Sequence, residues 1–292
     1  MILVLFLAQT LRIAVPYLFA AAGGALAERS GVVSLTLEGF MLGGAFGAVV
    51  GAHYTGSAWI GVVTGVAAGL LLGGVHAVCS IRFRADQVVV GVAINLFAVG
   101  ITRFLLQLAF GSSSNSPRVA GFGGAASGGA AAFLTNPLVW LGLAVMPVLA
   151  FVISKTTFGL RVRAVGEHPL AAASVGVPVS RVRYVSVVLS GALAALGGVY
   201  LALDQHQFTD SMTAGRGFIA LAAVIFGRWD PVRAGLACLL FAAAETLQIQ
   251  LQTAALIPSQ FVAMIPYVLT IVAVAGVVGR STPPSALGKP AE

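Results

Sequence analysis

Polar side chains that could bind a small solute are set into otherwise apolar stretches of this sequence. Glu245, Gln248 and Gln252 recur at i, i+3 and i+7, so they share one face of a helix. In apolar surroundings such a stripe needs either a polar neighbour or a watery path, because an unpaired polar group there is costly. The stripe therefore predicts an interhelical hydrogen-bond network or the lining of a solute pathway, and the residues alone leave both open.

Four further residues are candidates for the same pathway. Glu38 follows the helix break "ERSGVVSLT", and Asn95 is an isolated amide in an apolar segment. Phe40 and Phe218 each open a matching "GF" helix, where they could gate a path or stack on a base. Each of them also has an interpretation without a pathway. Glu38 could lie near the membrane surface, and the two rings could be ordinary packing residues. Asn95 could form a helix–helix hydrogen bond, which contributes ~0.6 kcal/mol on average. No nucleophile, paired-carboxylate or metal-ligand spacing stands out, so we expect neither catalysis nor a metal site.

The composition indicates whether these residues lie in a membrane or in a soluble domain. Of 292 residues, 59% are hydrophobic and only 9% are charged, whereas about a quarter of a soluble domain is charged. Apolar runs of roughly 18–25 residues recur, and a helix needs ~20 residues to cross a bilayer. The sequence predicts an all-α, polytopic membrane protein with a single transmembrane domain over residues 1–292. The net charge of +7 is explained by basic loops at the membrane surface rather than by nucleic acid.

About nine membrane segments (8–10) can be marked from the apolar runs. They are 11–27, 34–52, 57–79, 88–110, 136–154, 183–203, 213–227, 233–252 and 261–279. The seventh is suspect, because its uninterrupted apolar part covers only ~16 Å at 1.5 Å per residue. We expect it to be a broken or re-entrant helix.

Basic residues orient the chain across the membrane. Placing loop 155–182 in the cytoplasm puts twelve of the sixteen Lys and Arg residues on that side. The C-terminus is then cytoplasmic and the N-terminus outside.

A repeat relates the two ends of the chain. "AAAGG" (20–24) precedes "GFMLGGAF", and "AALGG" (194–198) precedes "GFIALAAV". With the charge-based orientation, the two copies run in opposite directions. This pattern predicts inverted halves at about 11–110 and 183–279, joined by a connector helix at 136–154, as in many transporters.

The central basic loop contains the signals of a very short helix. His168 stands at the cap position, and Pro169 in the first turn loses no hydrogen bond there. Gly176 suits a left-handed cap, and Pro178 prevents continuation. So short a helix needs something to pack against. It could be part of an ordinary topogenic loop or a docking element for a cytoplasmic protein.

The same loop carries a family resemblance. "FGLRVRAVGEHPLAAASVGV" (158–177) resembles the cytoplasmic loop of bacterial ABC importer permeases of the branched-chain amino acid, simple-sugar and nucleoside superfamily. Segments 28–46 and 214–252 are most similar to the nucleoside and simple-sugar branch, and the similarity runs from about residue 11 to 279. The chain departs from sugar-permease relatives in lacking a full extra N-terminal helix. The resemblance places seven residues in the family's ATPase-coupling segment: Glu167, His168, Pro169, Leu170, Ala171, Ala172 and Gly176. Leu170 stands where Glu is common in the family.

The resemblance implies a type II-like permease fold in the bacterial inner membrane and several partners. These are a second permease subunit in a heterodimer, cytoplasmic ATPase subunits and an extracytoplasmic substrate-binding protein. The chain contains no G-x4-G-K-[ST] phosphate loop, so no cofactor is expected in it, and ATP and Mg²⁺ would bind to the ATPase. We further expect Ala172 to lie against that partner.

Three functions remain in competition. The leading one is import of nucleosides or a related small polar solute. Simple sugars or branched-chain amino acids are the alternatives within the class. An ion-coupled secondary transporter is the alternative from another class, and it would not need a docking helix.

Overall fold

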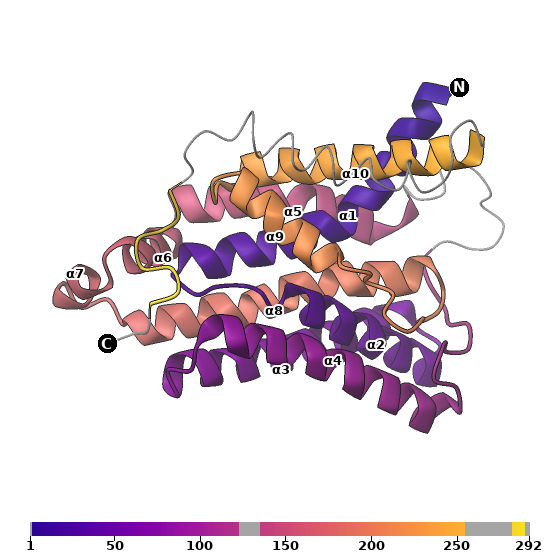
Figure 1. The fold of residues 1–292 in the computed structure, drawn as a ribbon, viewed down its shortest axis with the longest axis horizontal. Coiled ribbons are helices and arrows are strands. Elements are labelled where there is room, and N and C mark those ends of the chain that lie inside the picture. Colours follow the sequence, from indigo (N-terminus) through magenta and orange to yellow (C-terminus); the bar gives the residue numbers. More distant parts are fainter. Residues whose placement is uncertain (1, 123–134, 255–281, 290–292) are drawn as a thin grey trace.

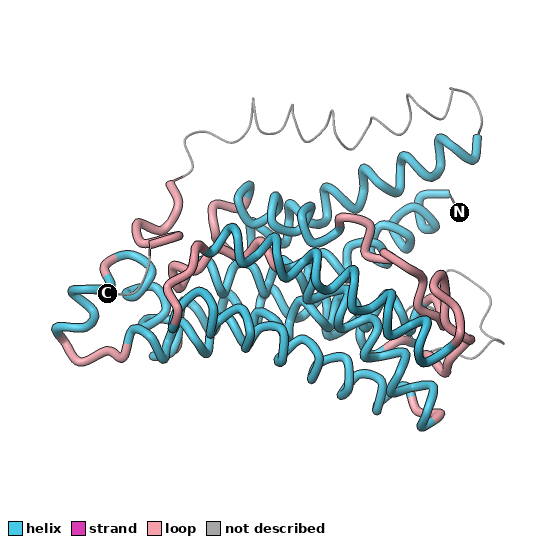
Figure 2. The backbone as a smooth tube through the Cα atoms, turned by 60° about the horizontal axis from the view of Figure 1, so that its bottom comes forward, coloured by secondary structure: helices cyan, strands magenta, loops and turns pink. Residues whose placement is uncertain are grey.

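The computed structural model describes residues 2–122, 135–254 and 282–289, and the regular structure in these ranges is helical (Figure 1). The first helices are α1 (Ile2–Arg29), α2 (Leu37–Thr55), α3 (Ala58–Ala77) with a π-helical turn η1 (Val78–Arg82), and α4 (Gln87–Phe110). They are followed by α5 (Pro137–Lys155), α6 (Thr157–Glu167), α7 (Pro169–Ser174), α8 (Val179–Asp204), α9 (Arg216–Phe226) and α10 (Pro231–Ala254). Figure 2 shows that most connecting loops gather at the two ends of the bundle.

Side-chain caps start several of these helices where the sequence changes from loop to apolar run. The Asp86 carboxylate accepts hydrogen bonds from Val88 N and Val89 N, each 2.9 Å away, at the start of α4. Asn136 accepts from Leu138 N at 3.0 Å, with Pro137 in the first turn of α5. Such caps satisfy backbone donors that have no partner within the helix.

Six helices of the described residues are long and apolar enough to cross a membrane. They are α1, α3 with η1, α4, α5, α8 and α10. The apolar α9 has only 11 residues, as the interrupted sequence predicted. Predicted segment 261–279 lies outside the described residues, and the count of nine is not confirmed. The chain is thus a multi-pass membrane protein, and residues 2–10 extend the first helix rather than forming another one.

Helix α8 lies at the centre of the bundle, with 67% of its most apolar window buried against 28% for α4. It packs against α1, α2 and α3, while α1 packs against α5, α8, α9 and α10. Small residues allow these close approaches. A Cβ on Gly198 would lie 1.8 Å from Met41 O, and one on Gly23 would lie 2.6 Å from Ser190 O. Without a hydrophobic force between helices in lipid, such tight backbone contacts are a main source of association.

Candidate functional site

The N-terminal ends of the two helices that begin at breaks, α2 and α9, meet inside the bundle at Glu38. This carboxylate accepts hydrogen bonds from Thr213 Oγ1 at 2.6 Å, Gly215 N at 2.8 Å and Gly217 N at 2.7 Å. The approach needs glycine at position 217, because a Cβ there would lie 2.4 Å from the backbone nitrogen of Glu38. A carboxylate from one helix therefore satisfies the free N–H groups and the positive dipole end of the other.

Asn95 on α4 holds the start of α2 from the other side. Its Oδ1 accepts from Gly39 N and its Nδ2 donates to Leu35 O, each at 2.8 Å. The side chain is buried and these two bonds employ both its acceptor and its donor groups. In this conformation Asn95 therefore forms hydrogen bonds between α4 and the start of α2, which is the second of the two roles considered for it.

A charged pair adjoins the Glu38 site. Arg216, the first residue of α9, forms an ion pair with Glu245 of α10 at 3.2 Å, and Glu245 also accepts a hydrogen bond from Tyr17 of α1. Both side chains of the pair are about one-fifth exposed. We call Tyr17, Glu38, Thr213, Arg216 and Glu245 the polar junction. It links α1, α2, α9 and α10 and offers both signs of charge to a solute.

The junction includes residues that the sequence interpretation missed. Tyr17, Thr213 and Arg216 are not among the pathway candidates that the sequence indicates. Arg216 has a local signal only for its place at a helix start, because it directly precedes the "GF" that opens the short helix. Nothing local marks Tyr17 or Thr213.

The remaining predicted pathway residues lie in different environments. Gln248 is half-buried and Gln252 is exposed on α10, one and two turns beyond Glu245. Phe40 is 1% exposed and packs edge-on against the His76 ring, with centroids 6.2 Å apart. Phe218 is 47% exposed. The two phenylalanines therefore differ in this conformation, because the Phe40 ring is buried and the Phe218 ring is about half exposed.

A second carboxylate ties the end of α1 to the turn after α9. Glu28 is 3% exposed and accepts from Trp229 Nε1 at 2.5 Å and from Ser34 N at 3.2 Å. Arg29 Nε donates to Trp229 O at 2.7 Å. Glu28 and Arg29 therefore both hold Trp229, which joins the end of α1 to the turn that follows α9.

The central loop contains the short helix that the sequence predicted, and it projects from one end of the bundle (Figure 1). Helix α7 begins at Pro169 after the cap residue His168 and ends before Gly176, whose φ is +83°. Gly176 has no atom within 4 Å of an added Cβ, so its glycine is explained by backbone conformation rather than by space.

One expectation for this helix was wrong. Ala172 does not present its side chain to a partner, because it is 4% exposed and belongs to the core of its own chain. A six-residue helix that lacks stability alone is held in place by this contact. The surface available to a partner is formed by Leu170, 66% exposed, and Val175, 78% exposed. Ala171 is exposed as well.

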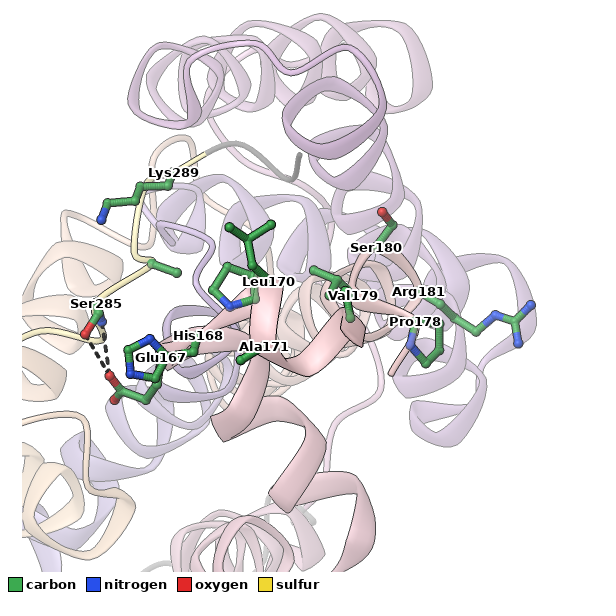
Figure 3. Close-up of a pocket in the computed structure, with 13 residues that line it drawn as sticks. Glu167, His168, Leu170, Ala171, Pro178, Val179, Ser180, Arg181, Ser285 and Lys289 are labelled. Carbon is green, nitrogen blue, oxygen red and sulfur yellow. Dashed lines mark hydrogen bonds between the residues drawn. The ribbon is translucent and has the colours of Figure 1, made fainter. Parts of the chain in front are cut away.

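An open hollow of about 1070 Å³ lies beside α7. Figure 3 shows Ser285 and Lys289 on one side of it, Val179, Ser180 and Arg181 on the other, and Leu170 between them. Glu167 and His168 also line it.

A family model described as "Branched-chain amino acid transport system / permease component" matches residues 6–274. The chain belongs to this permease family. It is 39% identical over 308 aligned residues to the guanosine ABC transporter permease protein NupQ of Bacillus subtilis, covering 99% of this chain and 97% of the relative. It is 36% identical to the nucleoside ABC transporter permease protein NupC of Lactococcus lactis, covering 97% and 95%.

A solved structure supports the fold of this family member. An ABC transporter described as of the metal-chelate type, in an inward-facing conformation, matches with a TM-score of 0.54 at 15% identity. The match covers 92% of this permease and 84% of that chain. At this identity the likeness concerns the fold alone. The permease is thus a transport component, and its resemblance to the ABC permease superfamily is confirmed.

Proposed function

We propose that this permease is the transmembrane subunit of an ATP-driven importer that moves nucleosides across the bacterial inner membrane. The observation that carries the proposal is the similarity to NupQ and NupC over nearly the full length of all three chains. Nucleosides are neutral at pH 7 and rich in hydrogen-bonding groups. This suits a junction in which Arg216 and Glu245 are paired with each other and Glu38 is engaged by three neutral donors.

The proposed pathway runs past the polar junction. Glu38 and Arg216 lie at the helix breaks where many transporters bind their cargo, and Glu245 faces Arg216 from α10. Gln248 and Gln252 continue the polar face along α10, and Phe218 offers an exposed ring. Asn95 and Phe40 would support the path from behind without touching the solute.

We further propose that the chain is built from inverted halves at about 11–110 and 183–279, with α5 as the connector. The contacts support this, because α1 packs against α9 and α10 while α8 packs against the equivalent α2 and α3. The glycines of the two "GG" copies both serve the crossing of α1 and α8, Gly23 at Ser190 and Gly197 at Pro16.

The proposed assembly contains a second, different permease subunit, ATPase subunits on the side of α7 and a substrate-binding protein on the opposite side. ATP and Mg²⁺ would bind to the ATPase. The basic residues near α7 favour a cytoplasmic position for this end and for the C-terminus, with the N-terminus outside.

Uptake into right-side-out vesicles loaded with ATP tests the function. We expect labelled guanosine to accumulate with internal ATP and the binding protein present, and not with a proton gradient alone. Uptake driven by the gradient would favour a secondary transporter. Accumulation of a simple sugar or of leucine in place of guanosine would assign the permease to another substrate branch.

A further inference from the structure

The C-terminal residues 282–289, here called the C-terminal strap, pass between the loop helices and the bundle. Ala286 N donates to Gly166 O at 2.9 Å, and Gly288 N donates to Gly31 O at 3.2 Å. The strap therefore joins α6, next to α7, to the segment that follows α1.

Side chains fix the strap at three points. The Ala286 side chain is 2% exposed. Glu167 accepts from Ser285 Oγ at 3.0 Å. Arg183 of α8, itself 1% exposed, donates from Nη1 to Lys289 O at 3.0 Å and from Nε to Ser30 O at 3.2 Å. A buried guanidinium is costly unless carbonyl groups are held to accept from it, so Arg183 and the strap stabilise each other.

The strap also forms one wall of the hollow beside α7. The opposite wall comes from the start of α8, and α7 itself lies between them. The hollow thus combines α7 and the start of α8, which are neighbours in the sequence, with a strap more than 100 residues later in the chain. Its shape depends on the strap as much as on α7.

Charge indicates what kind of surface can enter this hollow. Arg181 and Lys289 are exposed cations on its two walls, whereas the carboxylate of Glu167 is engaged by Ser285. Leu170 and Val175 add exposed apolar surface. An occupant with carboxylate groups around an apolar centre would satisfy both features. Because α7 projects beyond the spanning helices (Figure 1), a protein fits this position better than a lipid.

We propose that the C-terminal strap is part of the surface to which the ATPase subunit docks, together with α7. This inference rests on the proposed function, since it takes the partner at this end to be an ATPase. The strap contacts the partner through Ser285 and Lys289 and holds α6 and α7 to α1 and α8. Movement of the ATPase is then transmitted to the bundle through two connections instead of one.

Cysteine protection tests the proposal. Single variants Leu170→Cys, Ser285→Cys and Ser113→Cys are made in a background of Cys79→Ala and Cys238→Ala. All three positions are exposed, and Ser113 is in the loop after α4, at the other end of the bundle. The maleimide labelling rate is compared between tagged permease expressed alone and the complex co-purified with its ATPase from the native host.

We expect the ATPase to slow labelling at positions 170 and 285 about tenfold and to leave position 113 unchanged. Slowing at 170 with none at 285 overturns the role of the strap while keeping α7 as the docking element. Slowing at neither position overturns both. If labelling at position 285 is slowed in vesicles of anionic phospholipid without the ATPase, the strap binds lipid and the proposal is overturned. If guanosine uptake fails but both positions are protected, the strap proposal stands and only the substrate is wrong.

A bulky substitution then tests whether the strap transmits motion. Ala286→Trp cannot fit at a buried position without lifting the strap, whereas Thr282→Trp is exposed on the same segment. We expect Ala286→Trp to lower substrate-stimulated ATP hydrolysis about tenfold relative to Thr282→Trp, at equal amounts of permease in the membrane. Equal stimulation in both variants contradicts the transmitting role.

Discussion

At the level of single residues, Glu38 is the group on which the meeting of α2 and α9 depends. Its carboxylate replaces water for three donors on the other half of the chain, and Thr213 is 175 positions away. The bonds are charge-assisted and shielded by the bundle, which makes them stronger than their exposed counterparts. A residue first considered as a pathway candidate therefore also has a structural role.

Replacing Glu38 with Leu should lower both stability and uptake, because the Thr213 hydroxyl and two backbone N–H groups lose their acceptor. Hydrogen bonds to charged groups contribute about 1.5–3 kcal/mol each, so the melting temperature of the purified permease should fall measurably. Glu38→Gln keeps one oxygen that can accept two bonds and should lie between Leu and wild type. Gln107→Leu, at an exposed position of α4, is the control. An unchanged melting temperature in Glu38→Leu would contradict the capping role.

At the level of elements, the bundle is assembled by close contacts of helix backbones. Gly198 of α8 lies against α2 so closely that its substitution requires the helices to separate, whereas Gly100 of α4 has open space. Both positions are helical glycines in apolar segments. Only the neighbouring helix distinguishes them.

Gly198→Ala should therefore destabilise the permease by about 1–3 kcal/mol, the usual cost of overpacking. Gly100→Ala should be neutral or gain up to ~1 kcal/mol from the better helix propensity of Ala. Thermal unfolding of the two variants in the same detergent measures the difference. Equal melting temperatures would mean that α8 and α2 can move apart without cost.

The short helix α7 gives a prediction of its own. Gly176→Val should be strained, because its φ of +83° lies in the left-handed region, which costs an L residue about 1–2 kcal/mol and a β-branched one more. We expect loss of substrate-stimulated ATP hydrolysis with normal membrane insertion. Gly176→Asn, which tolerates this conformation, should retain most of the stimulation. Full stimulation in the Val variant would show that the turn after α7 is not needed for coupling.

At the level of the whole molecule, the direction of the chain across the membrane is the main prediction. Ala173→Cys, exposed on α7, should resist impermeant maleimides in intact cells and react in inside-out vesicles. Ser113→Cys should show the opposite pattern. Position 172 is unsuitable for this measurement, because its side chain is buried. Labelling of position 173 from outside would reverse the topology and remove the cytoplasmic ATPase from this end.

Several features of this protein follow from the sequence alone because they depend on neighbouring residues. The long apolar runs predict membrane helices, and His168, Pro169 and Gly176 delimit α7 through local backbone preferences. The interrupted apolar run before residue 227 likewise predicts the short α9. Each of these signals acts over a few positions, so a single sequence is enough to read it.

Only the tertiary structure decided which groups meet. The bonds of Glu38 to the start of α9, the ion pair of Arg216 with Glu245, and the passage of the strap beside α7 join segments that no local pattern relates. The same holds for Ala172, whose small side chain suits a partner's surface and its own core equally well. Which of the two it faces depends on how α7 is rotated against the bundle, and packing across long sequence separations sets that rotation.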